Sequence, residues 1–292
     1  MRPDRLVATF SIVARDPAVD EWGIAVQSRF LAVGAVVPWA QAGVGGVATQ
    51  AWANVAYGPA ALRWLRDGLS AADVVDRLVA ADEGRDHRQL GVVDAQGGSA
   101  AWTGPRCFRW AGHRSGVNYT CQGNILAGEA VILAMEDSFL GSRGPLSHRL
   151  VAALRAGQQA GGDSRGQQSA ALLVVREGGG YGGSTDRAVD LRVDDHASPI
   201  DELDRLLALH RVFFSPATAQ LTRAAGNVVR EMQEILTKQG YYHGPISAEY
   251  DAATRAAFKQ FCHMENFEAR YREDEFVDRE VLTFMRGRYG DA

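Results

Sequence analysis

The first clear pattern along the chain is an alternation of polar and apolar positions from Thr9 to Ala14. In an extended segment, Thr9, Ser11 and Val13 share one face, and the residues between them share the other. Asp16-Pro17 then interrupts the pattern. We therefore predict a short β-strand that begins with a hydroxyl side chain, and a second strand at 22–28 that pairs with it as a hairpin.

The same reading predicts the other elements of the first 212 residues. Continuous apolar runs bounded by glycine are typical of buried strands, and apolar residues with a period of 3.6 are typical of helices. The predicted strands cover 33–40, 44–51, 90–94, 99–103, 117–122, 168–176 and 188–194. The predicted helices cover 60–67, 71–81, 128–140, 146–158 and 200–212.

Strands and helices occur here in groups and do not alternate regularly, which argues against a doubly wound parallel sheet. Two antiparallel sheets packed together, with helices on the outside, account for this grouping. We therefore predict an α+β fold that is a four-layer αββα sandwich.

A boundary is predicted at Phe213-Phe214-Ser215-Pro216. Both lysines of the chain, Lys238 and Lys259, lie beyond it, and glycine becomes sparse there. Apolar periodicity predicts three helices in this part, at 218–239, 250–261 and 278–289. We expect two domains, 1–214 and 215–292, the second being a small three-helix domain.

Charge and hydropathy narrow the class of protein. The 31 basic and 35 acidic residues nearly balance, which argues against a general nucleic-acid binder or a binder of anionic membranes. No apolar run is long enough to span a bilayer. The apolar stretch before Thr9 is too short for a secretory signal, so a cytoplasmic location is expected.

Several chemistries are excluded or disfavoured by residue type. Without a lysine before residue 238, the first domain has neither a Schiff-base lysine nor a P-loop. The three cysteines fit no zinc pattern, and we expect reduced thiols. The glycine-rich segments 43–48 and 178–183 lack the strand–turn–helix context of a dinucleotide site. We expect neither a metal nor a cofactor.

Thr9 is the candidate nucleophile. A threonine at a chain terminus can activate its hydroxyl with its own α-amino group, so that nucleophile and base come in one residue. The alternative interpretation is an ordinary threonine in a core strand.

Segments spread over residues 8 to 211 resemble a bacterial family known as domain of unknown function 1028. The matching segments are 9–16, 22–34, 42–50, 122–124, 161–172 and 190–196. The family is placed with the amino-terminal-nucleophile (Ntn) hydrolases, whose fold is a four-layer αββα sandwich. The resemblance implies hydrolysis of an amide bond with Thr9 as nucleophile. Many members begin Met-Thr-Phe-Ser, whereas eight residues precede Thr9 here, so this route requires cleavage between Ala8 and Thr9 or a start site closer to Thr9.

Polar residues of the matching segments are the candidate site residues. Asn124 is suited to donate a hydrogen bond to an oxyanion, and Arg29 to bind a carboxylate in bidentate fashion. The candidate substrate-binding residues are Ser28, Arg29, Thr49, Gln50, Gln122, Asp163, Arg165 and Asp194. Their Asp–Arg combinations are equally well explained as ion pairs that join loops. In a third mechanism, Asp163 or Asp194 acts as a base on a bound water, and a Thr9→Ala protein stays active.

The C-terminal part resembles a helical peptidoglycan-binding domain, through residues 229–236, 240–246 and 251–258. Such domains place a glycan or peptide near the loop between the first two helices, where Tyr241 and Tyr242 would stack on it. The alternative is a helical appendage that covers the main domain or mediates dimer contacts.

Two functions follow. The first is an amidohydrolase that cleaves the C–N bond of a small-molecule or short-peptide amide with Thr9. The second is a non-catalytic Ntn-like protein that recognises a cell-wall fragment through its helical domain. Neither needs a nucleic acid or a membrane as partner, and both are compatible with a homo-oligomer.

Overall fold

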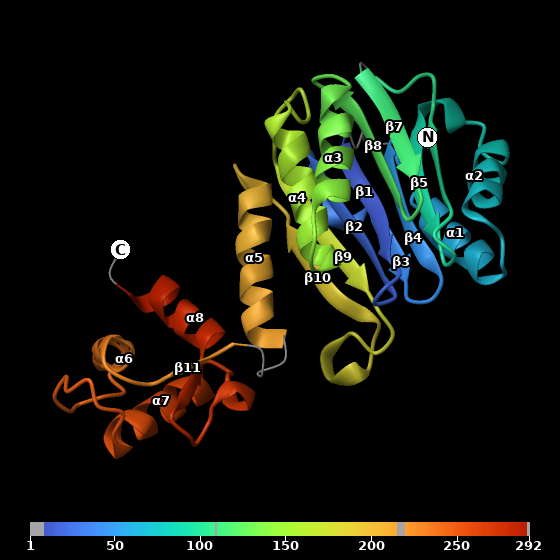
Figure 1. The fold of residues 1–292 in the computed structure, drawn as a ribbon. Helices are drawn as coiled ribbons and strands as arrows, with labels where there is room; N and C mark the ends of the chain where they lie inside the picture. Colours follow the sequence, from blue (N-terminus) through green and yellow to red (C-terminus); the bar gives the residue numbers. More distant parts are fainter. Residues whose placement is uncertain (1–8, 109, 215–219, 291–292) are drawn as a thin grey trace. The chain divides into compact units, whose positions relative to one another are not determined.

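A computed structural model of the protein describes residues 9–108, 110–214 and 220–290 (Figure 1). The chain divides into two compact units, Met1–Leu207 and Ala208–Ala292. This division falls within helix α5 (Pro199–Phe214), because Leu203 and Leu207 pack in the core of the first unit and Val212 packs in that of the second. The boundary expected from the sequence, between residues 214 and 215, lies at the end of this helix, and residues 215–219 are outside the described residues.

The larger sheet has six antiparallel strands in the order β10-β9-β2-β1-β8-β7. They are β1 (Thr9–Asp16), β2 (Glu21–Ser28), β7 (Trp110–Gly116), β8 (Tyr119–Leu126), β9 (Ser169–Val175) and β10 (Arg187–Val193). The predicted hairpin is confirmed, with Thr9 opposite Ser28. Strand β7 was not predicted, because this edge strand is partly exposed and lacks a run of apolar residues.

The smaller sheet has four antiparallel strands in the order β3-β4-β5-β6. They are β3 (Pro38–Gln41), β4 (Gly45–Ala51), β5 (Arg88–Asp94) and β6 (Ser99–Thr103). The strand expected at 33–40 is wrong in its first half, where Val33–Ala35 forms a 3-10 turn after Ala32 adopts a left-handed φ of 54°. Val33 and Val37 are fully buried all the same, so their apolar character reflects core packing and not strand pairing.

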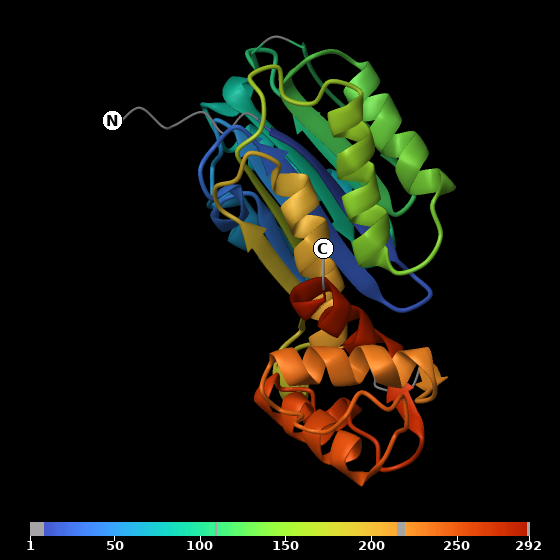
Figure 2. The same ribbon diagram turned by 90° about the vertical axis from the view of Figure 1, so that its left-hand side faces the viewer.

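Three apolar clusters hold the first unit together, and each lies between different elements. One packs α1 (Tyr57–Arg66) and α2 (Ala71–Ala80) on the smaller sheet, and another packs α3 (Ala130–Gly141), α4 (Leu146–Gln159) and α5 on the larger sheet. The third lies between the two sheets. Figures 1 and 2 show α3 and α4 on one side of the sheets and α1 and α2 on the other. The predicted α+β class with antiparallel sheets is confirmed.

The alternation in β1 decides which side chains enter which cluster. Phe10 and Ile12 face the helices α3 and α4, whereas Val13 faces the space between the sheets. Thr9 and Ser11 share the face of Val13. The polar start of β1 therefore lies between the sheets, as the pattern of this segment predicts.

The second unit contains the helices α6 (Asn227–Lys238), α7 (Ala252–Met264) and α8 (Arg279–Tyr289). It also contains a two-stranded sheet of β11 (Leu221–Arg223) and β12 (Phe276–Asp278), which the sequence did not predict. Position 218, where this helix was expected to begin, lies outside the described residues, and residues 220–226 are not helical: α6 begins after Gly226, whose φ of 53° ends the extended segment. Among the described residues, no helix is both long and apolar enough to cross a bilayer.

Candidate active site

At one end of the space between the two sheets, the buried side chains are amides and hydroxyls. We call this set the amide cluster. Its members are Ser11, Gln50, Gln89, Gln122 and Asn124. They come from β1, β4, β5 and β8, and each is at most 1% exposed. Because buried polar groups are costly unless they are hydrogen-bonded, the bonding of this cluster indicates what it can do.

Gln89 is the centre of the cluster, and backbone carbonyls set its orientation. Its Nε2 donates to the carbonyl oxygens of Gly123 at 2.8 Å and Gly112 at 3.2 Å. A carbonyl oxygen only accepts, so the Gln89 amide has one possible orientation. Its Oε1 therefore accepts from Gln50 Nε2 at 2.9 Å and from Asn124 Nδ2 at 2.8 Å.

The same reasoning sets the direction of the remaining bonds. Gln50 Nε2 also points at the carbonyl oxygen of Gln122, at 3.3 Å, so its Oε1 is the atom that accepts from Ser11 Oγ at 2.7 Å. Ser11 in turn accepts from Gln122 Nε2 at 2.7 Å, and Gln122 Oε1 accepts from Thr120 Oγ1 at 3.0 Å. Donor and acceptor are therefore assigned for each of these hydrogen bonds.

Thr9 lies at the edge of the amide cluster, at the first position of β1, and is fully buried. Its Oγ1 donates to Ser28 Oγ at 3.2 Å, and its carbonyl oxygen lies 3.4 Å from Gln50 Nε2. On its other side, the register pairs Phe10 with Gly123, so the next position sets Thr9 opposite Asn124. The structure thus brings together five candidates named from the sequence: Thr9, Ser28, Gln50, Gln122 and Asn124.

Two amides of the cluster are followed by residues in left-handed conformations. Ile125, after Asn124, has a φ of 55°, and Ala51, after Gln50, has a φ of 62°. A β-branched residue in this region is an outlier, and such strain costs on the order of 1–3 kcal/mol. Strained backbone of this kind concentrates at functional sites, and here it adjoins the two amides nearest Thr9.

Asp163 forms an ion pair with Arg165 of its own loop, and hydrogen bonds of Arg29 join this loop to the end of β2. Its carboxylate is fully buried and accepts from the side chain of Arg165 at 2.7 Å and from its backbone N–H at 2.9 Å. The backbone N–H of Arg29 lies 3.4 Å from the same carboxylate, and the Arg29 guanidinium donates to the carbonyl oxygen of Gln167 at 3.1 Å. These contacts tie the end of β2 to the segment before β9, in agreement with the structural interpretation of the Asp–Arg set.

Thr49 and Asp194 lie apart from the amide cluster. Thr49 is on the opposite face of β4 from Gln50, and its hydroxyl donates to the carbonyl oxygen of Asn54 at 3.2 Å. Asp194 is exposed, and its backbone oxygen accepts from Ala32 N at 3.0 Å. Neither contact brings the side chain toward Thr9.

Gln89 was missing from the sequence-based candidates. It lies in β5 between Arg88 and the apolar run that starts at Leu90, outside the segments that carry the family resemblance, so no motif marks it. The one available signal was a lone amide within a buried run of residues.

An ion pair supports β5 just before Gln89. Asp82 accepts from Arg88 Nε at 2.9 Å and from the hydroxyl of Tyr57 at 2.7 Å. Burial alone would raise the pKa of Asp82, but these hydrogen bonds and one from Gly84 N outweigh it and hold the pKa at about 2. The carboxylate is therefore charged at neutral pH and anchors the start of the strand.

His113 lies at the outer end of the network. Its Nδ1 is 2.9 Å from Thr103 Oγ1, which also accepts from Gln89 Nε2 at 2.9 Å. Burial lowers the pKa of His113, so the neutral imidazole is favoured at pH 7. Its role is that of a bonding partner for Thr103.

The thiols are unreactive. Cys107, Cys121 and Cys262 are free, and burial raises the pKa of all three, to about 11 for Cys107 and about 12 for Cys262. The thiolate is the nucleophilic form, so these side chains are not nucleophiles at neutral pH. Within the described parts of the chain, no group of three or more His, Cys, Asp or Glu residues is arranged to hold a metal ion.

The two tyrosines proposed to stack on a ligand have packing roles in the second unit. Tyr242 is only 2% exposed, and its hydroxyl donates to the carbonyl oxygen of Pro245 at 2.9 Å. Tyr241 packs edge-on against Phe261, with ring centroids 5.9 Å apart. The Tyr242 ring is thus enclosed in the core and does not present a face for stacking.

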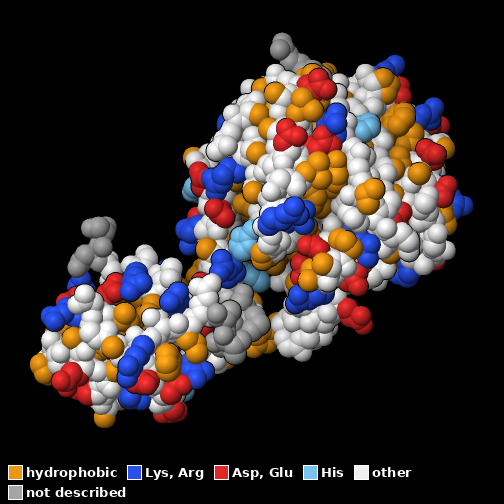
Figure 3. Space-filling model, in the orientation of Figure 1, with side chains coloured by type: hydrophobic (Ala, Val, Ile, Leu, Met, Phe, Trp, Pro, Cys, Tyr) orange, Lys and Arg blue, Asp and Glu red, His pale blue; other side chains and the backbone are white. Residues whose placement is uncertain are grey.

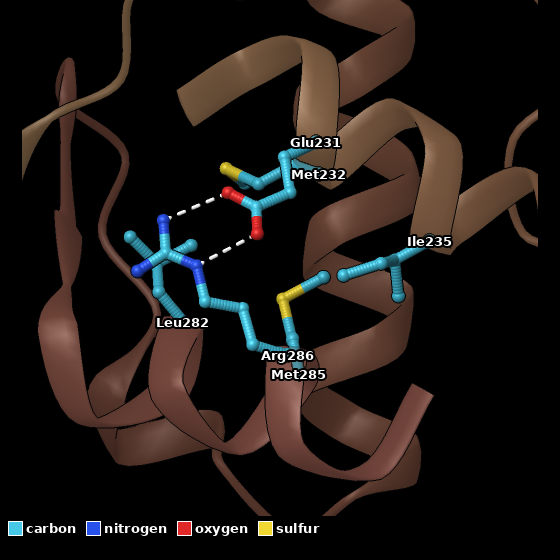
Figure 4. A pocket seen from close by; sticks show the side chains of 6 residues that line it. All are labelled: Glu231, Met232, Ile235, Leu282, Met285 and Arg286. Carbon is cyan, nitrogen blue, oxygen red and sulfur yellow. Dashed lines mark hydrogen bonds and ion pairs between the residues drawn. The ribbon is translucent and has the colours of Figure 1, made fainter. Parts of the chain in front are cut away.

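A shallow pocket lies between α6 and α8 of the second unit (Figure 4). Its lining residues are Glu231, Met232, Ile235, Leu282, Met285 and Arg286. Arg286 forms two hydrogen bonds of 2.8 Å with the Glu231 carboxylate across it. The lining is otherwise apolar and provides no nucleophile.

The face of the molecule shown in Figure 3 adds no feature of a single charge sign. On the face shown in Figure 3, basic and acidic side chains are intermixed and are not gathered by sign. This distribution agrees with the near balance of 31 basic and 35 acidic residues. On this face, no charged patch marks a binding surface.

Comparison with known proteins gives two family matches. Residues 9–203 match the model described as "Family of unknown function (DUF1028)", and residues 213–285 match the one described as "Putative peptidoglycan binding domain". The crystal structure of protein SPO2555 from Silicibacter pomeroyi, a DUF1028 protein, is similar, with 33% sequence identity and a TM-score of 0.65. The similarity covers 70% of this chain and 86% of that one. No curated protein matches the chain.

Proposed function

The chain belongs to the family of unknown function DUF1028, and we propose that it is an amidohydrolase with Thr9 as its N-terminal nucleophile. The substrate class is a small-molecule or short-peptide amide, whose C–N bond is cleaved. We further propose that the first unit is a four-layer αββα sandwich of the Ntn type. The three apolar clusters support this, since they pack helices on the outer face of each of two stacked sheets.

The observation that carries the proposal is the setting of Thr9. Thr9 is the first residue of a strand, and its hydroxyl is buried between the sheets beside Ser28, at the edge of the hydrogen-bonded amide cluster. A preorganised polar environment around a hydroxyl, inside an otherwise apolar core, is what nucleophilic catalysis requires.

The proposed reaction begins once cleavage between Ala8 and Thr9 frees the α-amine. Thr9 Oγ1 attacks the carbonyl carbon of the amide, and its proton moves to the α-amine. The α-amine then passes this proton to the leaving nitrogen as the C–N bond breaks, which leaves an ester on Thr9. Water hydrolyses the ester by the reverse proton path and regenerates the hydroxyl. Backbone N–H groups or Asn124 hold the oxyanion.

The water-based mechanism has less support. Asp163 is engaged by Arg165 and by two backbone N–H groups, and Asp194 is exposed and away from Thr9. The donors around Asp163 occupy the carboxylate oxygens that would otherwise accept a hydrogen bond from a bound water.

A second candidate function is binding without catalysis. The match of residues 213–285 to a peptidoglycan-binding domain supports a wall fragment as the partner of the second unit. We retain the cytoplasm as the proposed location, in which case that partner is a soluble fragment. Muropeptides therefore belong among the amides to be tested.

The intact mass and N-terminal sequence of the purified full-length protein, measured over days of incubation, test the first function. We expect a chain that begins at Thr9, cleavage that is lost in Thr9→Ala, and turnover of at least one compound in a panel of amides, carbamoyl compounds and muropeptides. Thr49→Val is the matched control, because it removes a buried hydroxyl from β4 of the other sheet, on the face of β4 opposite to Gln50.

Two outcomes would overturn the amidohydrolase. A chain that still begins at Met1 or Arg2 and binds muropeptides without hydrolysing them would favour the binding protein. Turnover that survives in Thr9→Ala would favour a bound water activated by a carboxylate.

A further inference from the structure

The side-chain amide of Asn124 has one polar atom with a hydrogen-bond partner and one without a partner among the described residues. Its Nδ2 donates to Gln89 Oε1 at 2.8 Å, whereas its Oδ1 is buried and has no hydrogen-bond partner within the described part of the chain. The residue as a whole is 1% exposed. A buried acceptor left without a donor is unfavourable, so this atom calls for an explanation.

The open atom cannot be exchanged for the bonded one by turning the amide. The carbonyl oxygens of Gly112 and Gly123 orient Gln89 so that its Oε1 faces Asn124. If Asn124 were flipped, two oxygens would face each other at hydrogen-bond distance. Gln89 therefore holds Asn124 with its oxygen turned away from the network.

Thr9 is the nearest candidate to supply the missing donor. The register that pairs Phe10 with Gly123, extended by one position, sets Asn124 opposite Thr9 on the face between the sheets, and Cβ atoms of directly opposite residues lie about 4.5–5.5 Å apart. Cleavage before Thr9 would convert its single backbone N–H into an amine with up to three N–H donors. Such an amine, buried beside an open carbonyl oxygen, would satisfy both groups.

Resting on the function proposed above, we propose that Asn124 Oδ1 accepts a hydrogen bond from the α-amine of Thr9, and that Gln89 is the residue that positions Asn124 for it. Binding one N–H of the amine to Oδ1 leaves its lone pair free to turn toward Thr9 Oγ1. Asn124 is then the orienting group of the base and not the oxyanion donor expected from the sequence. The oxyanion is left to backbone N–H groups.

Gln27 provides an internal comparison. It lies one position before Ser28, is fully buried, and neither polar atom of its amide has a partner in the described residues. It pairs with Phe10, so its side chain faces helices α3 and α4 and not the space between the sheets. Two amides with unpartnered polar atoms thus lie in the two strands that flank β1, and only Asn124 shares a face with Thr9.

The test is a titration of the α-amine in a chain that begins at Thr9 and retains every described residue. The protein is made with threonine labelled with ¹³C at the methyl group, and the shift of the Thr9 methyl is followed against pH. Because Oδ1 stabilises the charged amine, we expect Asn124→Leu to lower its pKa by about one pH unit. Asn124→Asp places a negative charge at the same atom and should raise the pKa.

Gln89→Met is expected to shift the pKa in the same direction as Asn124→Leu but by less, since it frees Asn124 to turn. Gln27→Met is the matched control and should leave the pKa unchanged. The opposite shifts for Leu and Asp separate a bond to the amine from general damage to the fold. If Asn124→Leu fails to fold, the expected rise of the α-amine pKa in Asn124→Asp still tests the inference.

A pKa that stays at the wild-type value in folded Asn124→Leu or Asn124→Asp would overturn the inference. The titration needs no substrate and no self-cleavage, so a protein that never hydrolyses an amide can still give the expected shifts. Conversely, the protein could hydrolyse amides while the pKa of its α-amine does not change when Asn124 is substituted. The proposed function would then stand, and only this inference would be wrong.

Discussion

The space between the two sheets has an aliphatic part and a polar part, and both are completely buried. The aliphatic part contains Val13, Ile24, Val26 and Val93, and the polar part is the amide cluster. The same strands contribute to both: β1 supplies Val13 to one and Ser11 to the other. Burial alone therefore does not explain which chemistry occupies which part.

The difference lies in what each part requires of its neighbours. Aliphatic side chains need only to fill volume, so many combinations would pack. Each amide needs a matched donor or acceptor, and a shift of strand register by one residue would leave several unmatched. The polar part contributes less to stability, but it specifies register and provides the directional groups that chemistry needs.

Ile24→Ala should have the largest effect on stability, because it leaves a cavity in the aliphatic part. We expect the free energy of unfolding of the first unit to fall by about 3 kcal/mol. All six tryptophans lie at or before residue 110, so tryptophan fluorescence in urea follows this unit selectively. Cleavage before Thr9 should continue in the folded variant. Loss of cleavage would contradict the view that only the polar part serves the chemistry. Leu236→Ala, in the second unit, should leave this transition unchanged.

Gln50→Leu should cost about 2–3 kcal/mol, because it removes the acceptor of Ser11 and a donor to Gln89. Unlike Ile24→Ala, it should also abolish cleavage before Thr9 under conditions where the protein is folded. The same urea titration and the intact mass measure the two effects. Normal cleavage in folded Gln50→Leu would show that the cluster is purely structural.

Asp82→Asn tests the ion pair that supports the start of β5, and its effect should depend on pH. The pKa of Asp82 is held at about 2 in the folded protein, below the value of about 4 expected when unfolded. The stabilisation is therefore present above about pH 4 and is lost as the pH falls toward 2. At pH 7 the variant should be less stable by about 1–2 kcal/mol, and the difference should vanish near pH 2.

Thermal unfolding followed by tryptophan fluorescence at several pH values measures this convergence. Asp86→Asn is the control, because Asp86 is more exposed and its nearest ion-pair atom, on Arg106, is 3.8 Å away. A constant difference between wild type and Asp82→Asn from pH 7 to pH 2 would contradict the role of the Asp82 charge.

Gln27→Met should have the smallest effect on stability, with the opposite sign to the others. The substitution removes two unpartnered polar atoms from the buried face toward the helices and keeps the side-chain length. We expect a change between zero and about 1 kcal/mol in favour of the folded state, read from the same urea titration. A loss as large as that of Gln50→Leu would mean that Gln27 has a partner, such as a buried water.

The sequence alone predicted the elements that have a local pattern. The alternation of Thr9 to Ala14, the hairpin to 28 and the apolar runs at 44–51 and 90–94 correspond to observed strands, because alternation and apolar runs are both set by neighbours along the chain. The sequence also led to the family, to Thr9, and to four of the residues that meet around it: Ser28, Gln50, Gln122 and Asn124.

Elements whose sequence reflects packing were not predictable in this way. Strand β7 is an exposed edge held by its pairing with β8, and the apolar run at 33–40 fills the core as a turn and a short strand. The start of α6 depends on a strand pair between β11 and β12, whose two partners are far apart in the chain.

What the tertiary structure alone decided is which polar residues meet and in which direction they bond. Gln89 entered the site because β5 pairs with β4 and packs against β8, and no local pattern records that meeting. Asp163 and Tyr242 were candidate site residues in the sequence. In the structure, Asp163 is held in an ion pair with Arg165, and Tyr242 is buried in the core of the second unit. A hydrogen bond is set by distance and angle between strands remote in sequence, whereas hydrophobic periodicity is set by neighbours along the chain.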